Sequence, residues 1–293
     1  MKRNLLWLFI SSVLLSSCSS FFQLVNVSPS SKMEEISFPS GLPDPKYQFF
    51  YADTLNNEYL RKLRNDYQLE QLVSGCKADT GKILNVLNWT SQQWEHNGSN
   101  TPTKSDALTI LKEAQEGKQF RCVEYGIVAN TALNSLGIRA RTLGLKTRDV
   151  EKVRRGAGHV VAEVYSKDLD KWIYIDPQFN IMPVLNGTPL NGVEFQQAIY
   201  SRDTGLKLIN RQGEIGEPDA ENYIKWVGKY LYYFDILFDQ QNLNSEKYQS
   251  VNGKTKLMLV PAGSPEPDVF QRKYPITYCH YTHSLNDFYQ KPE

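Results

Sequence analysis

The sequence predicts a mixed fold in which helices come first and antiparallel strands follow. Apolar side chains recur at helical intervals over 80–94 and 121–136. Apolar and polar residues alternate along 160–165 and 172–175, as in half-buried strands. Because only 166–170 joins these two stretches, we expect them to pair as an antiparallel hairpin.

The composition excludes several classes of function. The 293 residues carry 33 Lys+Arg against 32 Asp+Glu, a formal charge of +1. This balance provides no large basic surface, so nucleic acid is not expected as the main partner. Hydrophobic residues make up 41% of the chain, as in ordinary globular proteins. The length suits one elaborated domain or two modest ones, at roughly 100–200 residues each.

The N-terminus has the features of an export signal. Lys2 and Arg3 provide positive charge, 5–15 is an apolar stretch broken by two serines, and small residues precede Cys18. No stretch reaches the ~20 apolar residues that span a bilayer. Because Cys18 directly follows the small residues, the segment resembles the lipobox of bacterial lipoproteins. This resemblance implies cleavage before Cys18 and acylation of that residue. An ordinary secretory peptide with an incidental Cys is the alternative.

These features predict the organisation of the chain and its location. We expect a signal peptide over 1–17, a tether over 18–44 and a single domain over 45–293. Several acyl chains hold a protein firmly to a membrane. We therefore expect a lipid-anchored protein of the bacterial cell envelope, in the outer membrane where the cell has one. Disulfides can persist in that compartment.

The first elements of the domain follow from local patterns. A strand is expected over 46–51, and helices are expected over 55–67, 80–94 and 105–116, with Ser105 as the N-cap of the last. The helix over 121–136 is expected to end at Gly137. Small residues near its start, Gly126 and Ala129, let another layer of the fold approach it closely.

The remaining elements are expected to be mainly strands. One is predicted over 138–145, before the hairpin. The aromatic-rich stretch 223–238 favours β structure, with a helix as the alternative. Asn252-Gly253 is a hairpin signal, with 257–260 as the return strand. We expect this C-terminal third to be a β-rich elaboration of the same domain.

Cys122 lies in the first turn of a predicted helix, and this position suits a reactive thiol. A helix N-terminus presents unpaired N–H groups and a partial positive charge, which stabilise a thiolate and a developing oxyanion. A lone Cys is more often a small buried hydrophobe. His159 and Asp176, on the predicted hairpin, change that balance because an imidazole can take the thiol proton and a carboxylate can orient the imidazole.

The register of the hairpin decides whether these two side chains meet. With the loop 166–169, Tyr165 pairs with Asp170, and His159 lies directly opposite Asp176. A slip of two residues would keep both side chains on one face as diagonal neighbours. A slip of one would separate them, and it is disfavoured because apolar residues would leave the core.

Three segments together resemble a known family. They are FRCVEYGIVANTALNSLGIRARTLGL over 120–145, GAGHVVAEVY over 156–165 and WIYIDPQFN over 172–180. They are similar to the transglutaminase-like superfamily of papain-type cysteine enzymes, over roughly 75–185. The resemblance implies an α+β fold with the Cys-bearing helix packed on an antiparallel sheet, and acyl-thioester chemistry. It makes Cys122 the nucleophile, His159 the general base and acid, and Asp176 the orienting group.

The sequence departs from animal-type transglutaminases in two respects. No segment has the spacing of a calcium loop. A side-chain donor for the oxyanion is not evident: Gln119 and Gln93, with its neighbour Gln92, are the candidates, and each is more often a solvated polar residue. No cofactor is expected.

The other cysteines and histidines provide weaker signals. Cys76 and Cys279 remain after Cys18 and Cys122 are assigned, and they could form a disulfide in an exported protein. Cys279, His280 and His283 lie close together, but without a fourth ligand they are a weak zinc signal, so no metal is expected.

Two hypotheses for the function follow. The first is an envelope lipoprotein whose thiol acts on amide bonds of peptides or proteins, releasing the acyl group to water or to an amine. Peptidoglycan stems are one substrate in this class. The second is a binding or assembly module that keeps the fold without turnover. The oligomeric state is not determined by the sequence.

Overall fold

The computed structural model describes residues 35–54, 56–241, 243–244 and 247–292. The predicted signal peptide and Cys18 lie outside these residues. In chain order the elements are β1 (Phe50–Tyr51), α1 (Glu58–Asp66), α2 (Leu69–Val73), α3 (Asp79–Ser91), α4 (Ala107–Gln115), α5 (Cys122–Ser135), β2 (Ala140–Lys146), β3 (Gly158–Ser166), β4 (Lys171–Ile175), β5 (Met182–Leu185), β6 (Thr188–Pro189), α6 (Gly192–Ser201), β7 (Leu206–Asn210), β8 (Gly213–Glu214), α7 (Asp219–Val227), the 3-10 helix η1 (Gly228–Tyr230), β9 (Tyr233–Leu237), β10 (Asp239–Gln240), β11 (Lys256–Leu259), β12 (Val269–Phe270), β13 (Tyr274–Pro275), β14 (Cys279–Thr282) and α8 (Leu285–Phe288).

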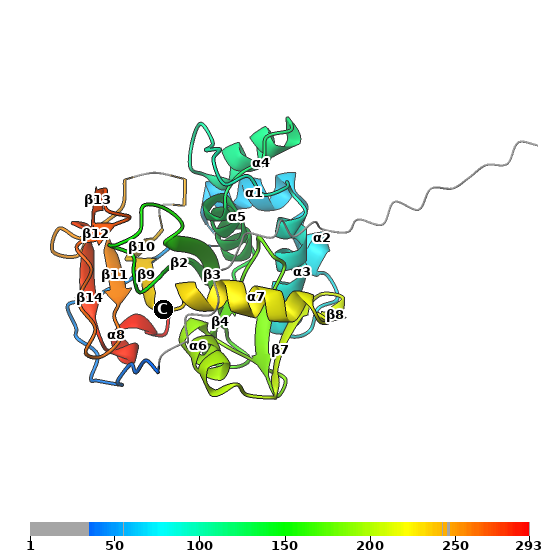
Figure 1. The fold of residues 1–293 in the computed structure, drawn as a ribbon. Helices are drawn as coiled ribbons and strands as arrows, with labels where there is room; N and C mark the ends of the chain where they lie inside the picture. Colours follow the sequence, from blue (N-terminus) through cyan, green and yellow to red (C-terminus); the bar gives the residue numbers. More distant parts are fainter. Residues whose placement is uncertain (1–34, 55, 242, 245–246, 293) are drawn as a thin grey trace, which may run out of the picture. The chain divides into compact units, whose positions relative to one another are not determined.

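A six-stranded sheet in the order β14-β11-β9-β2-β3-β4 forms the centre of the fold (Figure 1). All its neighbouring strands are antiparallel except β11 and β14, which are parallel. The predicted α+β class and the antiparallel pairing of β3 with β4 are therefore confirmed. Strands β9, β11 and β14 come from the C-terminal third, so this part of the chain completes the main sheet.

Helix α5 packs closely against one face of the sheet, as its small residues predict. A Cβ on Gly126 would lie 3.0 Å from Cγ1 of Val160 and 3.2 Å from the carbonyl oxygen of Val161. Only a residue without a side chain permits this approach. The helix ends at Gly137, which adopts a φ of +77° that glycine tolerates without strain. Its N-terminus, where Cys122 lies, is thereby fixed relative to β3.

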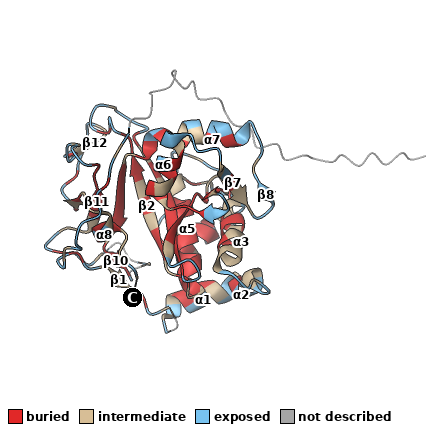
Figure 2. Ribbon diagram, turned by 90° about the horizontal axis from the view of Figure 1, so that it is seen from below, coloured by how far each residue is buried: buried red, intermediate tan, exposed pale blue. Residues whose placement is uncertain are grey.

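The opposite face of the sheet is covered by α6 and α7. Tyr223 and Val227 of α7 are fully buried, in a cluster with Val161, Tyr174 and Phe234 of the sheet. Figure 2 shows buried strands beneath α7, whose outer side is exposed. Both faces of the central strands are therefore buried, and the expectation that only one face is covered by core does not hold. A smaller sheet, β6-β5-β7-β8, follows in the chain. Its Met182 and Val184 pack in the cluster on the α5 side, and its Leu208 packs in the cluster on the α7 side.

The aromatic stretch 223–238 is divided between two structures. Its first part is helical, in α7 and η1, and its last part forms β9. The mainly β interpretation was wrong for the first part because α7 and η1 place Tyr223, Val227 and Tyr230 at helical intervals towards the core. Near the C-terminal strands, Asn252 and Gly253 have φ values of +46° and +78°. The predicted turn is present, but it closes on a single bridge between Val251 and Lys254. The predicted return strand 257–260 overlaps β11, which pairs with β9.

Two boundaries differ from the expected ones. Helix α4 is capped by Asp106 and not by Ser105, because the Asp106 carboxylate accepts a bond from the amide of Thr109 at 3.1 Å. The segment 36–44 is bonded to the domain at several points and is not part of a free tether, although most of its side chains are exposed. Phe38 is buried, and its ring lies 5.9 Å from that of Phe234. Burial of the apolar ring of Phe38 stabilises the contact of this segment with the domain.

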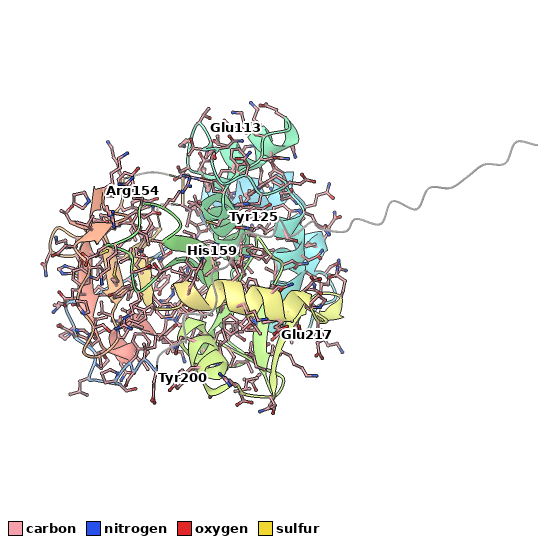
Figure 3. The ribbon with its side chains drawn as sticks, in the orientation of Figure 1. Glu113, Tyr125, Arg154, His159, Tyr200 and Glu217 are labelled. Atoms are coloured by element: carbon pink, nitrogen blue, oxygen red, sulfur yellow. The ribbon has the colours of Figure 1, made fainter. Side chains whose placement is uncertain are left out.

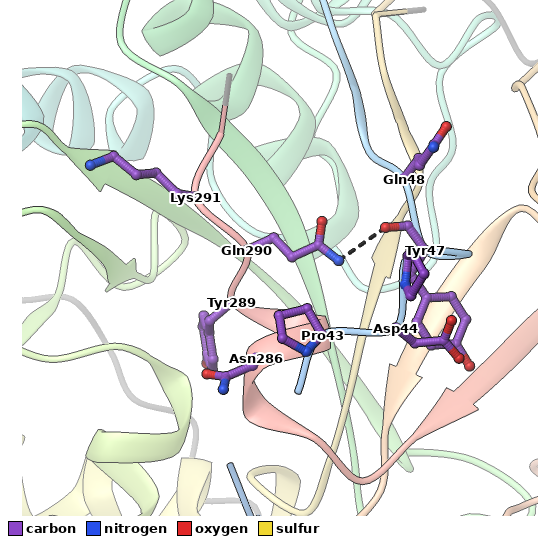
Figure 4. Close-up of a pocket in the computed structure, with 9 residues that line it drawn as sticks. Pro43, Asp44, Tyr47, Gln48, Asn286, Tyr289, Gln290 and Lys291 are labelled. Atoms are coloured by element: carbon purple, nitrogen blue, oxygen red, sulfur yellow. Dashed lines mark hydrogen bonds between the residues drawn. The ribbon is translucent and has the colours of Figure 1, made fainter. Parts of the chain in front are cut away.

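The packed N-terminal segment and the C-terminus flank a groove of about 510 Å³ (Figure 4). The side-chain amide of Gln290 donates to the carbonyl oxygen of Tyr47 at 3.0 Å across it. The residues that line it include no cysteine or histidine. Among the described helices, none combines the length and the apolar character needed to cross a bilayer.

Candidate active site

Cys122 is the first residue of α5, and its helical turn is held by a charged pair. Arg121 is the N-cap, and its guanidinium donates to the buried carboxylate of Glu124 at 2.6 Å. The same carboxylate accepts the backbone amide of Arg121 at 3.1 Å. These bonds from Arg121 to Glu124 fix the first turn and leave Cys122 half-buried. The thiol thus lies at the positive end of the helix dipole.

His159 and Asp176 meet, although not through the predicted register. Nε2 of His159 lies 2.7 Å from Oδ2 of Asp176. Strands β3 and β4 pair Tyr165 with Trp172 and Ser166 with Lys171, so the expected pairing of Tyr165 with Asp170 was wrong by two residues. The two side chains are diagonal neighbours on one face of the hairpin. A slip of two residues preserves the face because side chains alternate with a period of two.

The imidazole of His159 connects the thiol to the carboxylate. One ring nitrogen contacts Asp176. The sulfur of Cys122 lies close enough to the ring to favour its protonated form, both as a hydrogen-bond acceptor and through its negative charge. Burial lowers the pKa of His159, but the negative charge of Asp176 and the bonds to Asp176 and Cys122 outweigh it and raise the pKa to about 9. The imidazole can therefore hold a proton at neutral pH while it lies beside a thiolate.

The carboxylate of Asp176 is fully buried and has four hydrogen-bond donors. Oδ2 accepts from His159 and from the hydroxyl of Tyr223, the latter at 2.8 Å. Oδ1 accepts the backbone amides of Gln178 at 3.1 Å and Phe179 at 3.4 Å. Donors on both oxygens hold the orientation of this buried carboxylate.

Aromatic rings enclose the imidazole on the side of α7. The ring of Trp226 lies 4.9 Å from that of His159 in an edge-to-face arrangement, and Tyr230 and Phe179 follow at 6.0 and 6.2 Å. Figure 3 shows the labelled His159 beside α7. Edge-to-face packing fixes the orientation of the ring, and the apolar surroundings exclude water.

The side-chain amides of Gln119 and Gln93 are directed to other partners. The amide of Gln119 donates to Glu95 at 3.3 Å, and that of Gln93 donates to the carbonyl oxygen of Trp89 at 2.7 Å. Neither is placed as a free donor for an oxyanion. Gln93 lies one turn after Trp89 on α3, so its amide is satisfied locally.

Trp94 offers a donor that the sequence patterns did not identify. Its indole N–H is buried and has no acceptor among the described residues. Its ring lies 4.4 Å from that of Tyr125, on the first turn of the Cys-bearing helix, and 5.7 Å from that of Phe120. Buried donors without partners are costly, which marks this N–H as a functional candidate. A tryptophan two residues before His96 carried no distinguishing signal in the sequence.

His96 also lies close to the site. Burial lowers its pKa, and the nearby positive charge of His159 lowers it further. The charge of His159 therefore influences the protonation of His96. Its position in the sequence favours a loop-capping role over a place in the cleft.

The disulfide that Cys76 and Cys279 could form in an exported protein is not present. Both are free thiols. Cys76 follows α2 and accepts a bond from the amide of Asn85 at 3.2 Å, whereas Cys279 is buried in β14 with Val150 and Met258. The two residues pack in different layers of the fold, and a disulfide requires Cα atoms within about 7 Å.

The C-terminal histidines have structural partners. The ring of His280 contacts the carbonyl oxygen of Val251 at 2.8 Å, and that of His283 contacts the carbonyl oxygen of Val260 at 2.9 Å. In the part of the chain that the structure describes, no group of three or more His, Cys, Asp or Glu side chains is arranged to hold a metal ion.

Comparison with known proteins identifies the part of the chain that carries the site. Residues 67–177 match the transglutaminase-like superfamily. No curated protein matches the chain. Among solved structures, a candidate cysteine protease from Cytophaga hutchinsonii aligns at 16% identity with a TM-score of 0.33, over 45% of this chain and 40% of that protein. A protein described as a TGase aligns at 19% identity and a TM-score of 0.29, over 43% and 34%. Red sea bream transglutaminase aligns at 18% identity and a TM-score of 0.25, over 43% and 25%.

Proposed function

Because residues 67–177 belong to the transglutaminase-like superfamily, we propose that the chain is a thiol enzyme that acts on amide bonds through Cys122. One observation carries this proposal. The ring of His159 contacts the carboxylate of Asp176 at 2.7 Å, and the sulfur of Cys122 acts on the same ring. This is the arrangement that nucleophilic acyl transfer requires.

The reaction would proceed in two halves. The sulfur of Cys122 attacks the carbonyl carbon of the substrate, and its proton passes to His159. The bond between carbon and nitrogen then breaks, the leaving amine takes the proton from His159, and a thioester remains on Cys122. In the second half, water or an amine attacks the thioester while His159 takes its proton. The thiol recovers this proton as the product leaves.

Two sets of donors are suited to the developing oxyanion. The first turn of α5 presents backbone N–H groups at Cys122. The buried indole N–H of Trp94 provides a side-chain donor beside the same turn. One donor of this kind contributes on the order of 10²–10³ in rate. We therefore assign Trp94, in place of Gln119 and Gln93, to this role.

The first experiment measures the activation of the thiol. Iodoacetamide should alkylate Cys122 near neutral pH faster than it alkylates Cys76, a half-buried thiol in the same chain that serves as the internal reference. His159→Gln should reduce the rate at Cys122 and leave Cys76 unchanged. If Cys122 reacts no faster than Cys76, a binding module without turnover is the better description.

The second experiment identifies the substrate. We propose peptide amides of the cell envelope as the substrate class, with peptidoglycan stems among them. Incubation with envelope extract should leave a mass adduct on Cys122 that hydroxylamine releases, as expected for a thioester. Cys122→Ser serves as the control. No adduct under any of these conditions would count against acyl transfer.

We also propose that the protein is anchored to the membrane through Cys18. The proposal rests on the charged start, the apolar stretch 5–15 and the small residues before Cys18. Cells supplied with an alkyne analogue of palmitate should incorporate it into the wild-type chain and not into Cys18→Ser. Equal labelling of both chains would exclude lipidation at this residue.

A further inference from the structure

We propose that Tyr223 is a positioning residue of the thiol site, acting through Asp176 on His159. The functional unit then comprises four side chains, and the fourth comes from α7. The inference rests on the proposed function of Cys122. It concerns a residue 46 positions beyond the end of the family match at 177, in a segment that the three sequence motifs do not include.

The contacts of Asp176 are the first argument. Its Oδ2 atom accepts two bonds, from His159 at 2.7 Å and from Tyr223 at 2.8 Å. The two backbone amides at 178 and 179 hold Oδ1. Among the described residues, the hydroxyl of Tyr223 is therefore the one group besides His159 that bonds Oδ2, the atom that orients the imidazole. Without that hydroxyl, the carboxylate is restrained mainly through Oδ1, by the longer bonds from the amides at 178 and 179.

The direction of the bonds is the second argument. A tyrosine hydroxyl has one proton, and Tyr223 donates it to Asp176. The contact of 2.9 Å between the hydroxyls of Tyr174 and Tyr223 must therefore have Tyr174 as its donor. Burial and the charge of Asp176 raise the pKa of Tyr223 well above its usual range, so it stays protonated. The result is a relay from Tyr174 to Tyr223 to Asp176, in which each bond strengthens the next.

The location of Tyr223 is the third argument. Tyr223, Trp226 and Tyr230 lie on one face of α7 and η1, and the two last rings pack against His159. Tyr223 is fully buried within this group. One helical segment thus holds the carboxylate with a hydroxyl and the imidazole with aromatic rings. A phenylalanine would fill nearly the same volume in the core. The hydroxyl of Tyr223 therefore has a role beyond packing, which is its bond to Asp176.

The charged and titratable groups around the pair are few. Cys122 acts on His159 from α5, and the charge of His159 in turn lowers the pKa of His96 in the segment after α3. Tyr230 faces the ring from η1, and Tyr125 and Tyr174 lie near Asp176. None of these groups forms a hydrogen bond to Oδ2 of Asp176, the atom that contacts His159. Removal of the Tyr223 hydroxyl should leave more negative charge on that oxygen, which then holds the proton of His159 more tightly.

The test uses the full chain and iodoacetamide as the probe. The rate of alkylation of Cys122 is measured against pH, and its alkaline inflection reports the loss of the His159 proton. Tyr223→Phe should move this inflection upwards by about 0.5–1 pH unit, the effect of one hydrogen bond. Tyr174→Phe should move it in the same direction by less. Titration of the His159 ring protons by NMR should give the highest pKa in Tyr223→Phe, a smaller rise in Tyr174→Phe and the lowest pKa in the wild type.

Tyr233→Phe is the matched control. Tyr233 is also buried, and its hydroxyl donates to the carbonyl oxygen of Pro265 at 3.1 Å, away from the site. It should leave the profile unchanged. If wild-type Cys122 is activated and both Tyr223→Phe and Tyr174→Phe superimpose on it, the positioning role is wrong while the thiol mechanism stands. If the wild type shows no activated thiol, both proposals fail. Should Tyr223→Phe not fold, Tyr174→Phe decides alone.

Discussion

His159 and Asp176 contact each other at 2.7 Å although they are diagonal, not opposite, neighbours across β3 and β4. Asp176 follows the last paired residue of β4 and is held by a bridge to Ile181, where its amide donates to the Ile181 carbonyl at 2.8 Å. The carboxylate is thereby placed at the end of the strand, beside the ring. The contact between His159 and Asp176 requires that both side chains lie on the same face of the hairpin. It does not require that the two residues lie directly opposite each other.

Loss of the orienting carboxylate should impair catalysis without abolishing the thiol. Asp176→Asn keeps the size of the side chain but removes the charge that stabilises the imidazolium, so turnover should fall by about 10³–10⁴. The measurement is the rate of acyl release from the adduct-forming substrate. Asp239→Asn changes a buried Asp in β10 and should preserve turnover. Equal rates for Asp176→Asn and the wild type would contradict the proposed role.

The stability provided by His159 should depend on pH. Its pKa is raised to about 9 in the folded chain against about 6.5 when unfolded, so folding binds the proton more tightly. The resulting stabilisation, on the order of 3 kcal/mol, is fully present below pH 6.5 and is lost as pH rises through 9. Urea unfolding of the wild type and His159→Gln should show a difference that shrinks between about pH 6 and about pH 10. A constant difference would exclude this linkage.

The buried ion cluster beside β9 should be sensitive to loss of its acid. Asp235 is buried between Lys146 and Lys256, with the latter's Nζ 2.5 Å from Oδ1, and the two ammonium groups hold its pKa well below the usual range. Asp235→Asn leaves two cations without a counter-charge, and we expect a loss of about 3–5 kcal/mol in the free energy of unfolding.

The exposed pair of Lys207 and Glu214 provides the control for this change. Glu214→Gln should leave the midpoint of urea unfolding unchanged, because exposed pairs are hydrated and screened. Similar midpoints for Asp235→Asn and Glu214→Gln would show that the buried cluster does not stabilise the fold.

The close approach of α5 to the sheet should make Gly126 intolerant of a side chain. Gly126→Ala places a Cβ at 3.0 Å from Val160, which forces the helix outwards and should cost about 1–3 kcal/mol. Alkylation of Cys122 should slow as well, because the thiol moves with the helix. Gly81→Ala is the control: its Cβ would lie 3.6 Å from the sulfur of Cys76, an ordinary contact. That change should stabilise α3 by up to about 1 kcal/mol. Destabilisation by both changes would contradict the argument from packing.

Much of the site could be predicted from local patterns. The start of α5 at Cys122 and its end at Gly137 follow from helical spacing and from a residue that adopts positive φ. The shared face of His159 and Asp176 follows from the alternation along the hairpin. The C-terminal stretch was harder to predict, because aromatic residues favour strands intrinsically while their spacing in α7 is helical. Neither the strand propensity of the aromatic residues nor their spacing predicts by itself where α7 ends and β9 begins.

The sequence by itself determined which side chains could form the thiol site, because the periods of helix and strand are properties of the local backbone. Only the tertiary structure decided the register of the hairpin, the bond of Tyr223 to Asp176 across 47 residues, and the completion of the main sheet by β9, β11 and β14. These contacts depend on how separate elements pack together. Packing is set by the shape and volume of many side chains at once, which no local repeat records.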